Sequence, residues 1–204
     1  MNFKVILQKI IDTPPRVIFL KFARKIYPHF LMSQTEKLRS LPRYTAATIA
    51  FQGKPLKIAD ARSFSFMHKE IFEKEIYRFS TGNNKPLIID CGSNIGISII
   101  YFKNLYPDAE IIGFEPDDVI YDILKHNINT FGYDDVILIK KGVWNKEGRQ
   151  SFCSEGADGG RIIDNEETKN PTIIETDRLR KYLDRKVELL KIDIEGSEVE
   201  VIED

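Results

Sequence analysis

The amino-acid sequence predicts an α/β fold built on an open, doubly wound parallel sheet. Two observations support this prediction. From residue 87 onward, short apolar strands alternate with helical stretches, an order that gives parallel strands joined by right-handed crossovers. A glycine-rich turn, residues 91–96, separates the first of these strands from the helix that follows it, as is typical of such sheets.

Composition narrows the class of protein. Of the 204 residues, 42% are hydrophobic and 30% are charged, a balance that excludes a mostly disordered or fibrous chain. The formal net charge of −1 argues against nucleic acid as a partner, because binding its phosphates requires an excess of basic side chains. Two cysteines cannot form a disulfide framework, so we expect a reducing, cytoplasmic compartment.

The charge is distributed unevenly along the chain. Residues 1–43 contain nine lysines and arginines against two acids, a net charge of +7, and the remaining 161 residues carry −8. This leader is expected to form two amphipathic helices separated by Thr13-Pro14-Pro15. A basic amphipathic helix can lie on an anionic membrane, which predicts peripheral membrane contact; the alternative is docking on the body or on another subunit of a homo-oligomer. No apolar run suits a membrane span or a secretory signal.

Residues 44–85 are expected to form an extension in front of the sheet. Thr45–Phe51 and Leu56–Ala59 predict the two strands of a β-hairpin, with the turn signal Gln52–Pro55 between them. Met67–Phe79 predicts a helix, because its apolar residues recur at helical spacing.

Residues 86–204 are expected to carry the sheet itself. The expected order is a strand at Leu87–Ile89, a helix at Ile97–Leu105, a strand at Ile111–Phe114, a helix between Asp117 and Gly132, and a strand at Val136–Ile139. The strands are short continuous apolar runs, as in sheets covered on both faces. Asp117 and Asp118 suit the N-terminus of the second helix.

The segment that follows interrupts this alternation. Expected there are antiparallel strands at Ser151–Cys153 and Thr172–Ile174, a loop at 156–160, a short helix at Leu179–Leu183, a fourth core strand at Val187–Asp193 and a final helix entered through residues 195–198. The loop is a candidate wall of a substrate site, with Arg161 contacting a polar substrate; a flexible hairpin tip is the alternative.

The strongest chemical signal is the turn Asp90–Gly96. Gly92 and Gly96 allow a ligand to approach the backbone closely, and the helix N-terminus offers free N–H groups. The spacing differs from the dinucleotide pattern G-x-G-x-x-G, and Asp90 precedes it. Because an acid there repels a pyrophosphate, the turn suits a positively charged ligand without phosphate, such as S-adenosylmethionine. The alternative is a plain tight turn with Asp90 as a helix cap.

A second signal is Glu115, which stands at the end of the second strand, 19 residues after Gly96. In sheets of this type an acid at this distance accepts hydrogen bonds from ribose hydroxyls. Pro116 fixes the turn that follows. A lone acid at a strand end is otherwise a solvated charge, so the ribose interpretation depends on the glycine-rich turn beside it.

Four motifs in order resemble those of the FkbM-type methyltransferases. They are Asp90–Gly96, Phe114-Glu115-Pro116, Gly142-Val143-Trp144 and Leu190–Glu198. This family is similar to class I S-adenosylmethionine-dependent enzymes, mostly O-methylating sugars, polyketides and other secondary or surface metabolites. The resemblance runs from about residue 87 to the end and implies a Rossmann-like class I methyltransferase sheet. Family members continue with about three further strands, so we expect a C-terminally truncated chain that lacks the far edge of the acceptor pocket.

The resemblance also implies roles for single residues. Asp90, Gly92, Ser93, Asn94 and Gly96 would hold the methionine part of the cofactor, Glu115 with Pro116 the ribose, and Val143 with Trp144 the adenine. Trp144 is the only tryptophan, and a packed aromatic is the alternative interpretation of it.

Three acids, Asp193, Glu195 and Glu198, follow the fourth strand, where such sheets face the transferred group. Methyl transfer from a sulfonium is an in-line displacement, so positioning contributes most of the acceleration. A carboxylate could also accept the proton of the acceptor hydroxyl; Asp193 is the first candidate for this catalytic role and Glu195 the second. The alternatives are that these two acids order the turn, that they pair with Lys191 or Arg161, or that the cluster holds a divalent metal. No metal is expected, because nothing else in the sequence supports a metal site.

These expectations combine into one function. The chain would transfer a methyl group from S-adenosylmethionine to a hydroxyl oxygen of a sugar, glycan or secondary metabolite, its small-molecule or glycan partner. A nicotinamide-dependent dehydrogenase would require the G-x-G-x-x-G turn that is absent here. The remaining alternative is a truncated, noncatalytic module that binds cofactor or docks on a partner.

Overall fold

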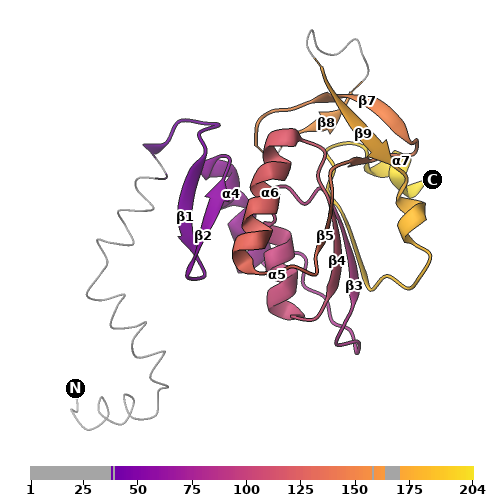
Figure 1. Cartoon of the computed structure of the whole chain (residues 1–204), viewed down its shortest axis with the longest axis horizontal. Helices are drawn as coiled ribbons and strands as arrows, with labels where there is room; N and C mark the ends of the chain where they lie inside the picture. The colour runs from indigo at the N-terminus through magenta and orange to yellow at the C-terminus, as the bar shows by residue number, and fades with distance from the viewer. Residues whose placement is uncertain (1–37, 39, 158, 164–170) are drawn as a thin grey trace. The chain divides into compact units, whose positions relative to one another are not determined.

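A computed structural model describes residues 38, 40–157, 159–163 and 171–204 (Figure 1). Contacts within the chain divide it into two units, Met1–Leu41 and Pro42–Asp204. The second unit holds both the extension expected at 44–85 and the sheet. The two helices expected in the basic leader lie outside the described residues. Among the described residues, no helix is long and apolar enough to cross a membrane.

The main sheet has four parallel strands. They are β3 (Leu87–Cys91), β4 (Glu110–Phe114), β5 (Ile137–Ile139) and β10 (Leu189–Ile192), and they lie side by side in the order β10-β3-β4-β5. Ile89 is opposite Ile112 on one side and Leu190 on the other. The predicted parallel α/β sheet is therefore confirmed, and β3 continues two residues beyond its expected end.

Two helices connect the first three strands on one face of the sheet (Figure 1). The first, α5 (Ile97–Leu105), has the expected bounds and is buried along most of its length, as its apolar sequence requires. The second, α6 (Asp118–Phe131), is capped by Asp117, whose carboxylate accepts from the N–H groups of Val119 and Ile120, and is followed by Gly132 with φ +73°. Both ends agree with the sequence.

The opposite face is covered by shorter elements. Residues of β3 and β4 that point to this face pack with Leu179 of the 3-10 helix η2 (Leu179–Tyr182) and Val201 of α7 (Glu198–Ile202). The final helix begins at Glu198, three residues after the first residue of its expected entry.

A second sheet carries the strands expected around the glycine-rich loop. Its members are β6 (Gly142–Val143), β9 (Thr172–Asp177), β7 (Gly148–Cys153) and β8 (Arg161–Ile162), in the order β6-β9-β7-β8. β7 and β9 are antiparallel, with Ser151 opposite Ile173, as predicted.

The extension consists of the hairpin β1 (Ala47–Phe51) and β2 (Lys54–Ile58) and then a helix. The helix differs from the prediction: α4 spans Ala61–His68 and continues as the π-helix η1 (Lys69–Glu73). It begins six residues early because the Asp60 carboxylate caps the N–H groups of Arg62 and Ser63.

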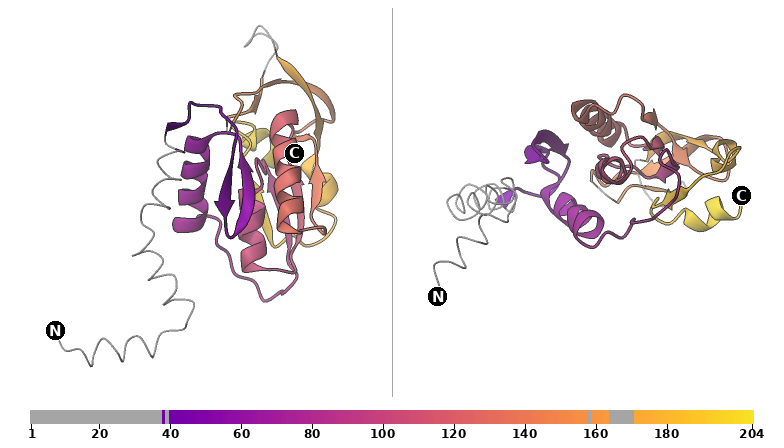
Figure 2. Two further views of the ribbon diagram at one scale, coloured as in Figure 1. Left: turned by 60° about the vertical axis from the view of Figure 1, so that its left-hand side comes forward. Right: turned by 90° about the horizontal axis from the view of Figure 1, so that it is seen from below.

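One buried side chain ties the extension to the sheet domain. The amide oxygen of Asn127, on α6, accepts from the Lys57 N–H at 2.8 Å. Its amide nitrogen donates to the carbonyl oxygens of Lys57 at 2.9 Å and Ile95 at 2.8 Å. Asn127 therefore connects β2, α6 and the glycine-rich turn, and the hairpin runs alongside α6 (Figure 2).

Candidate functional site

A cavity of about 310 Å³ lies where β3, β4 and β10 end. Residues 92–94, 115–117 and 193–195, which directly follow these three strands, contribute to its lining. Residues of the second sheet and of the extension complete it. Because the carboxyl ends of parallel strands meet at one edge of the sheet, the topology places the predicted site residues together there.

At Gly92, the glycine-rich turn has a backbone conformation that only glycine permits. Gly92 has φ +82°, and a β-carbon there would fall well inside contact distance of the Asp193 carbonyl oxygen. Gly96, with φ +88°, is instead required for packing, because its β-carbon would lie 2.8 Å from Leu124 Cδ1 of α6. Gly96 does not line the cavity, in contrast to Gly92.

The backbone N–H groups of this turn are already used. Those of Gly92 and Ser93 donate to the Phe114 carbonyl oxygen, at 3.1 and 2.8 Å. The Asn94 N–H donates to Glu115, the next N–H to the Asn94 side chain, and the Gly96 N–H to the Ser93 carbonyl oxygen. No backbone N–H of residues 92–96 is therefore left for a ligand, whereas the free N–H groups expected at the helix N-terminus belong to α5, which begins at Ile97, and stay a prediction. A phosphate would find no cradle in this turn.

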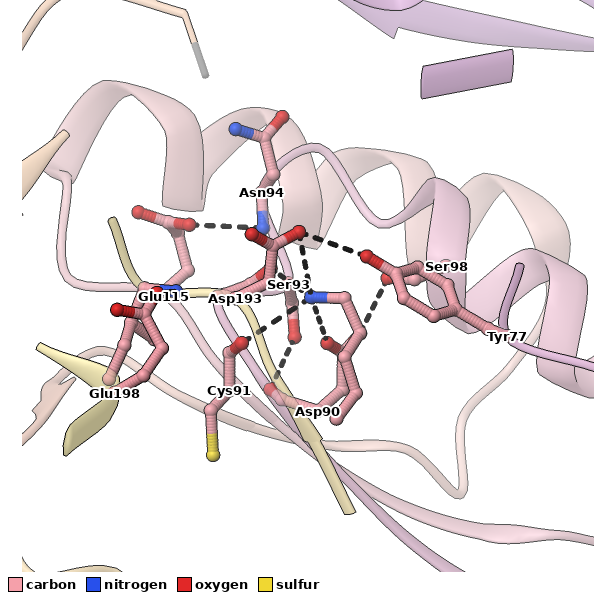
Figure 3. Close-up of polar contacts among 12 residues, drawn as sticks. Tyr77, Asp90, Cys91, Ser93, Asn94, Ser98, Glu115, Asp193 and Glu198 are labelled. Atoms are coloured by element: carbon pink, nitrogen blue, oxygen red, sulfur yellow. Dashed lines mark hydrogen bonds and ion pairs between the residues drawn. The ribbon is translucent and has the colours of Figure 1, made fainter. Parts of the chain in front are cut away.

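Asp90 lies behind the turn and does not line the cavity. Its side chain is fully buried, with Oδ1 2.9 Å from Lys191 Nζ and Oδ2 accepting from Ser98 Oγ at 2.5 Å (Figure 3). Lys191 Nζ also donates to the Gly92 carbonyl oxygen at 2.8 Å. Asp90, which is predicted to contact the cofactor, instead forms an ion pair with Lys191, and Lys191 in turn holds the turn through the Gly92 carbonyl oxygen. The negative charge of Asp90 is therefore balanced by Lys191.

Glu115, which is predicted to contact the ribose, lines the cavity. Its carboxylate accepts from the Asn94 N–H at 3.0 Å and from the Asp117 N–H at 2.9 Å, and the residue is 6% exposed. Burial raises the pKa of Glu115 to about 7, against these two backbone hydrogen bonds, which lower it. The side chain can therefore accept hydrogen bonds from a ligand and changes charge close to neutral pH.

The other predicted cofactor residues separate into two groups. Ser93, Asn94, Pro116 and Val143 line the cavity. Trp144 does not; its backbone N–H donates to the Asp177 carbonyl oxygen at 2.9 Å, and it is half-buried beside the second sheet.

The three acids after β10 have different surroundings. The Asp193 and Glu195 residues line the cavity, and Asp193 is exposed. Glu198 is committed to the turn, because its two carboxylate oxygens accept from the N–H groups of Ile194 at 3.1 Å and Gly196 at 2.8 Å. Within the described residues, no three histidines, cysteines, aspartates or glutamates are placed to hold a metal ion.

Of the residues that surround Asp193, sequence reasoning named Lys191 as an alternative partner and missed Tyr77. The phenol of Tyr77, from the extension, donates to Asp193 Oδ2 at 2.9 Å (Figure 3). Burial and the neighbouring Asp193 carboxylate raise the pKa of Tyr77, so this phenol remains a donor. Lys191 Nζ lies 5.5 Å from the Tyr77 ring centre and 4.0 Å from the Asp193 carboxylate. A lysine inside an apolar strand was a signal for Lys191, whereas no local pattern marks Tyr77.

The charges around the cavity are unbalanced. Six lining residues are acids, Glu70, Glu115, Asp117, Glu155, Asp193 and Glu195, and two are lysines. Both lysines are paired with acids outside the lining, Lys191 with Asp90 at 2.9 Å and Lys141 with Asp177 at 3.5 Å; Lys191 also lies 4.0 Å from the lining acid Asp193, and the lining acid Glu70 is paired with Lys74. The cavity therefore favours a ligand with positive charge.

Fold and site together define an α/β protein with a ligand cavity at the carboxyl edge of a parallel sheet. Comparison with known families shows which one it is. The model of the methyltransferase FkbM domain matches residues 90–204, so the chain belongs to the FkbM methyltransferase family.

The chain is also similar to individual proteins. The chain is 29% identical over 177 residues to "Methyltransferase sdnD" of Sordaria araneosa and 23% identical over 162 residues to "Methyltransferase 1" of Beauveria bassiana (strain ARSEF 2860). Each match covers 67% of this chain, and they cover 67% and 65% of the two relatives. The crystal structure of methyltransferase FkbM from Methylobacillus flagellatus KT is similar over 64% of this chain and 31% of its own, with 19% identity and a TM-score of 0.46.

Proposed function

We propose that this chain binds S-adenosylmethionine in the cavity and transfers its methyl group to a hydroxyl oxygen of a small molecule or glycan. One observation carries the proposal: the turn at residues 92–96 has no free N–H groups for a phosphate, while the cavity around it is rich in carboxylates. A cationic cofactor without phosphate matches both properties. Membership of the FkbM family supports the same conclusion.

The residues present fit the parts of this cofactor. Glu115 offers buried carboxylate oxygens to the two ribose hydroxyls, and Val143 offers an apolar surface to the adenine. Gly92 leaves room for close approach, and Asp193 and Glu195 place negative charge near a sulfonium or an ammonium group. Bound there, the cofactor supplies a methyl group activated by the positive sulfur.

The protein contributes position and a proton acceptor. Asp193 is proposed to take the proton of the acceptor hydroxyl through a carboxylate oxygen as the new carbon–oxygen bond forms. Tyr77 donates to Asp193 Oδ2 and so fixes the direction of this carboxylate, which leaves Oδ1 for the acceptor. Lys191 holds the turn through Asp90 and the Gly92 carbonyl oxygen, keeping Gly92 beside Asp193.

Calorimetric titration of the 204-residue chain with S-adenosylmethionine and S-adenosylhomocysteine tests the proposal. Saturable binding is expected at pH 8, and Glu115→Gln should weaken it about tenfold, because the variant cannot accept from two ribose hydroxyls and two backbone N–H groups. Glu110→Gln is the matched control, since Glu110 lies at the other end of β4 and pairs with Lys85 and Arg185. No binding by a folded wild-type chain, or equal weakening by both variants, would contradict the proposal.

A further inference from the structure

One wall of the cavity comes from the extension. It consists of the lining residues Phe66, Met67, Glu70, Ile71, Ile76 and Tyr77, which we call the extension wall. The first four follow the spacing of one helical face along α4 and η1. The π-helical turn η1 lies within this wall, and such turns are frequent at functional sites.

The extension wall is unusually apolar for a surface in contact with water. Phe66 is 62% exposed and Ile76 is 51% exposed, although both are large hydrophobic residues at a cavity. The one acid among them, Glu70, pairs with Lys74 at 2.7 Å. Exposed apolar side chains gathered at a cavity indicate a surface that a ligand covers.

The position of this wall separates it from the proposed cofactor residues. Tyr77 reaches Asp193 with its hydroxyl, so the wall meets the site at the proposed proton acceptor. Gly92 and Glu115 directly follow β3 and β4, which come after β10 in the order of the sheet. A molecule held against Ile76 and Phe66 would therefore present its edge to Asp193.

We propose that the extension wall is the acceptor site, and that the acceptor has an apolar body carrying a hydroxyl group that meets Asp193. This inference rests on the proposed methyl transfer. A free sugar fits the wall poorly, because hydroxyls on all its sides would lose their hydrogen bonds to water against Phe66 and Ile76. An apolar body covers those side chains, and its single hydroxyl finds Asp193 and Tyr77.

The test uses 2-naphthol, a neutral aromatic body with one hydroxyl, as a fluorescent probe for the full chain, with and without S-adenosylhomocysteine. Saturable binding is expected, weakened about fivefold by Phe66→Ala and by Ile76→Ala, because each variant removes apolar contact area. Ile137→Ala is the control, since Ile137 is 55% exposed but does not line the cavity. Methyl β-D-glucoside, titrated by calorimetry, should bind at least tenfold more weakly than 2-naphthol.

Binding of 2-naphthol tests the acceptor site, and binding of S-adenosylhomocysteine tests the proposed methyl transfer on which this inference rests. S-adenosylhomocysteine should bind wild type, Phe66→Ala and Ile76→Ala within about twofold of one another, because neither residue is placed at the cofactor. If 2-naphthol fails to bind, binds the three proteins equally, or binds more weakly than the glucoside, the acceptor site is not this wall. If S-adenosylhomocysteine fails to bind while the naphthol result holds, the wall is a ligand site and the methyltransferase proposal is wrong.

Discussion

The ammonium group of Lys191 lies 2.9 Å from the carboxylate of Asp90, and both side chains are almost completely buried. The two residues are direct neighbours in the register of β10 and β3. Lys191 also holds the carbonyl oxygen of Gly92, so the pair links the two strands to the turn that shapes the cavity. Its role is therefore to fix the site from behind.

Replacing one member of this pair should be costly. Lys191→Met leaves the Asp90 carboxylate buried with Ser98 as its remaining side-chain partner, and we expect the free energy of unfolding to fall by about 3 kcal/mol. Urea unfolding followed by circular dichroism measures this loss. The double variant Asp90→Asn/Lys191→Met should regain much of it, because no buried charge is left. A Lys191→Met protein as stable as wild type would show that the pair does not hold the fold.

The raised pKa of Glu115 should make its contribution to stability depend on pH. Its pKa rises from 4.5 to about 7 on folding, so the folded chain holds more protons than the unfolded chain between these values. Stability from this group is complete below pH 4.5 and is lost by pH 7, a change of about 3 kcal/mol. The unfolding free energy of wild type minus that of Glu115→Gln should fall by this amount from pH 4.5 to 7; a constant difference would contradict the raised pKa.

The same carboxyl group should make cofactor binding depend on pH in the opposite direction. Ribose hydroxyls donate to the ionised form, and with a pKa near 7 only about a tenth of Glu115 is ionised at pH 6. The affinity for S-adenosylhomocysteine should therefore rise about tenfold from pH 6 to 8 in calorimetric titrations. Glu115→Gln has no such proton to lose, and an equal pH dependence in this variant would assign the effect to another group.

Gly92 should not tolerate a side chain. Gly92→Ala combines φ +82° with a clash against the Asp193 carbonyl oxygen, and we expect it to lower the free energy of unfolding by about 2 kcal/mol and to abolish detectable cofactor binding. Gly82→Ala is the comparison, because nothing lies within 4 Å of a β-carbon there. Thermal unfolding and calorimetric titration of both variants measure the two losses. Equal stability and equal cofactor affinity of the two variants would show that the turn can relax around a methyl group.

Asn127 should contribute stability that a neighbouring asparagine does not. Asn127→Ala removes one acceptor and two donor contacts and leaves the buried carbonyl oxygen of Ile95 and two partly buried backbone groups of Lys57 without this partner, so a loss of about 2 kcal/mol is expected. Asn129 lies on the same helix with an exposed side chain, and Asn129→Ala should change stability by less than about 0.5 kcal/mol. Chemical unfolding of both proteins measures the difference, and equal losses would remove the special role of Asn127.

Much of the sheet could be predicted because local patterns define it. The bounds of α5 follow from an apolar run between a glycine turn and Pro107, and those of α6 from the cap Asp117 and the terminator Gly132. The sequence predicts too late a start for α4, because Phe64 and Phe66 alternate with polar residues after the cap Asp60, whereas the apolar stripe used for the prediction lies further along. The start of a helix can be predicted from sequence only where the N-cap residue and the apolar stripe indicate the same position.

The site was predictable only where a strand end determines a position. Glu115 and Asp193 follow β4 and β10 and line one cavity, because parallel strands deliver them to one edge. Asp90 and Trp144 could not be placed this way: which side of the backbone they face depends on Lys191 and on the second sheet. The contact between Tyr77 and Asp193 joins residues 116 positions apart, and no local rule reports it.

The neighbouring positions of β3 and β10 have a kinetic consequence. Lys191 and the Cys91 carbonyl oxygen that it contacts are 100 residues apart in sequence, so this edge of the sheet closes a loop that contains most of the α/β unit. Loop closure over such a distance is entropically costly and slows folding. The segment from β3 to β5 can fold through nearer contacts, and the ligand cavity is then completed only when β10 docks. Cofactor added during refolding should therefore leave the rates of the early steps unchanged. It should stabilise only the product of the last step, the docking of β10.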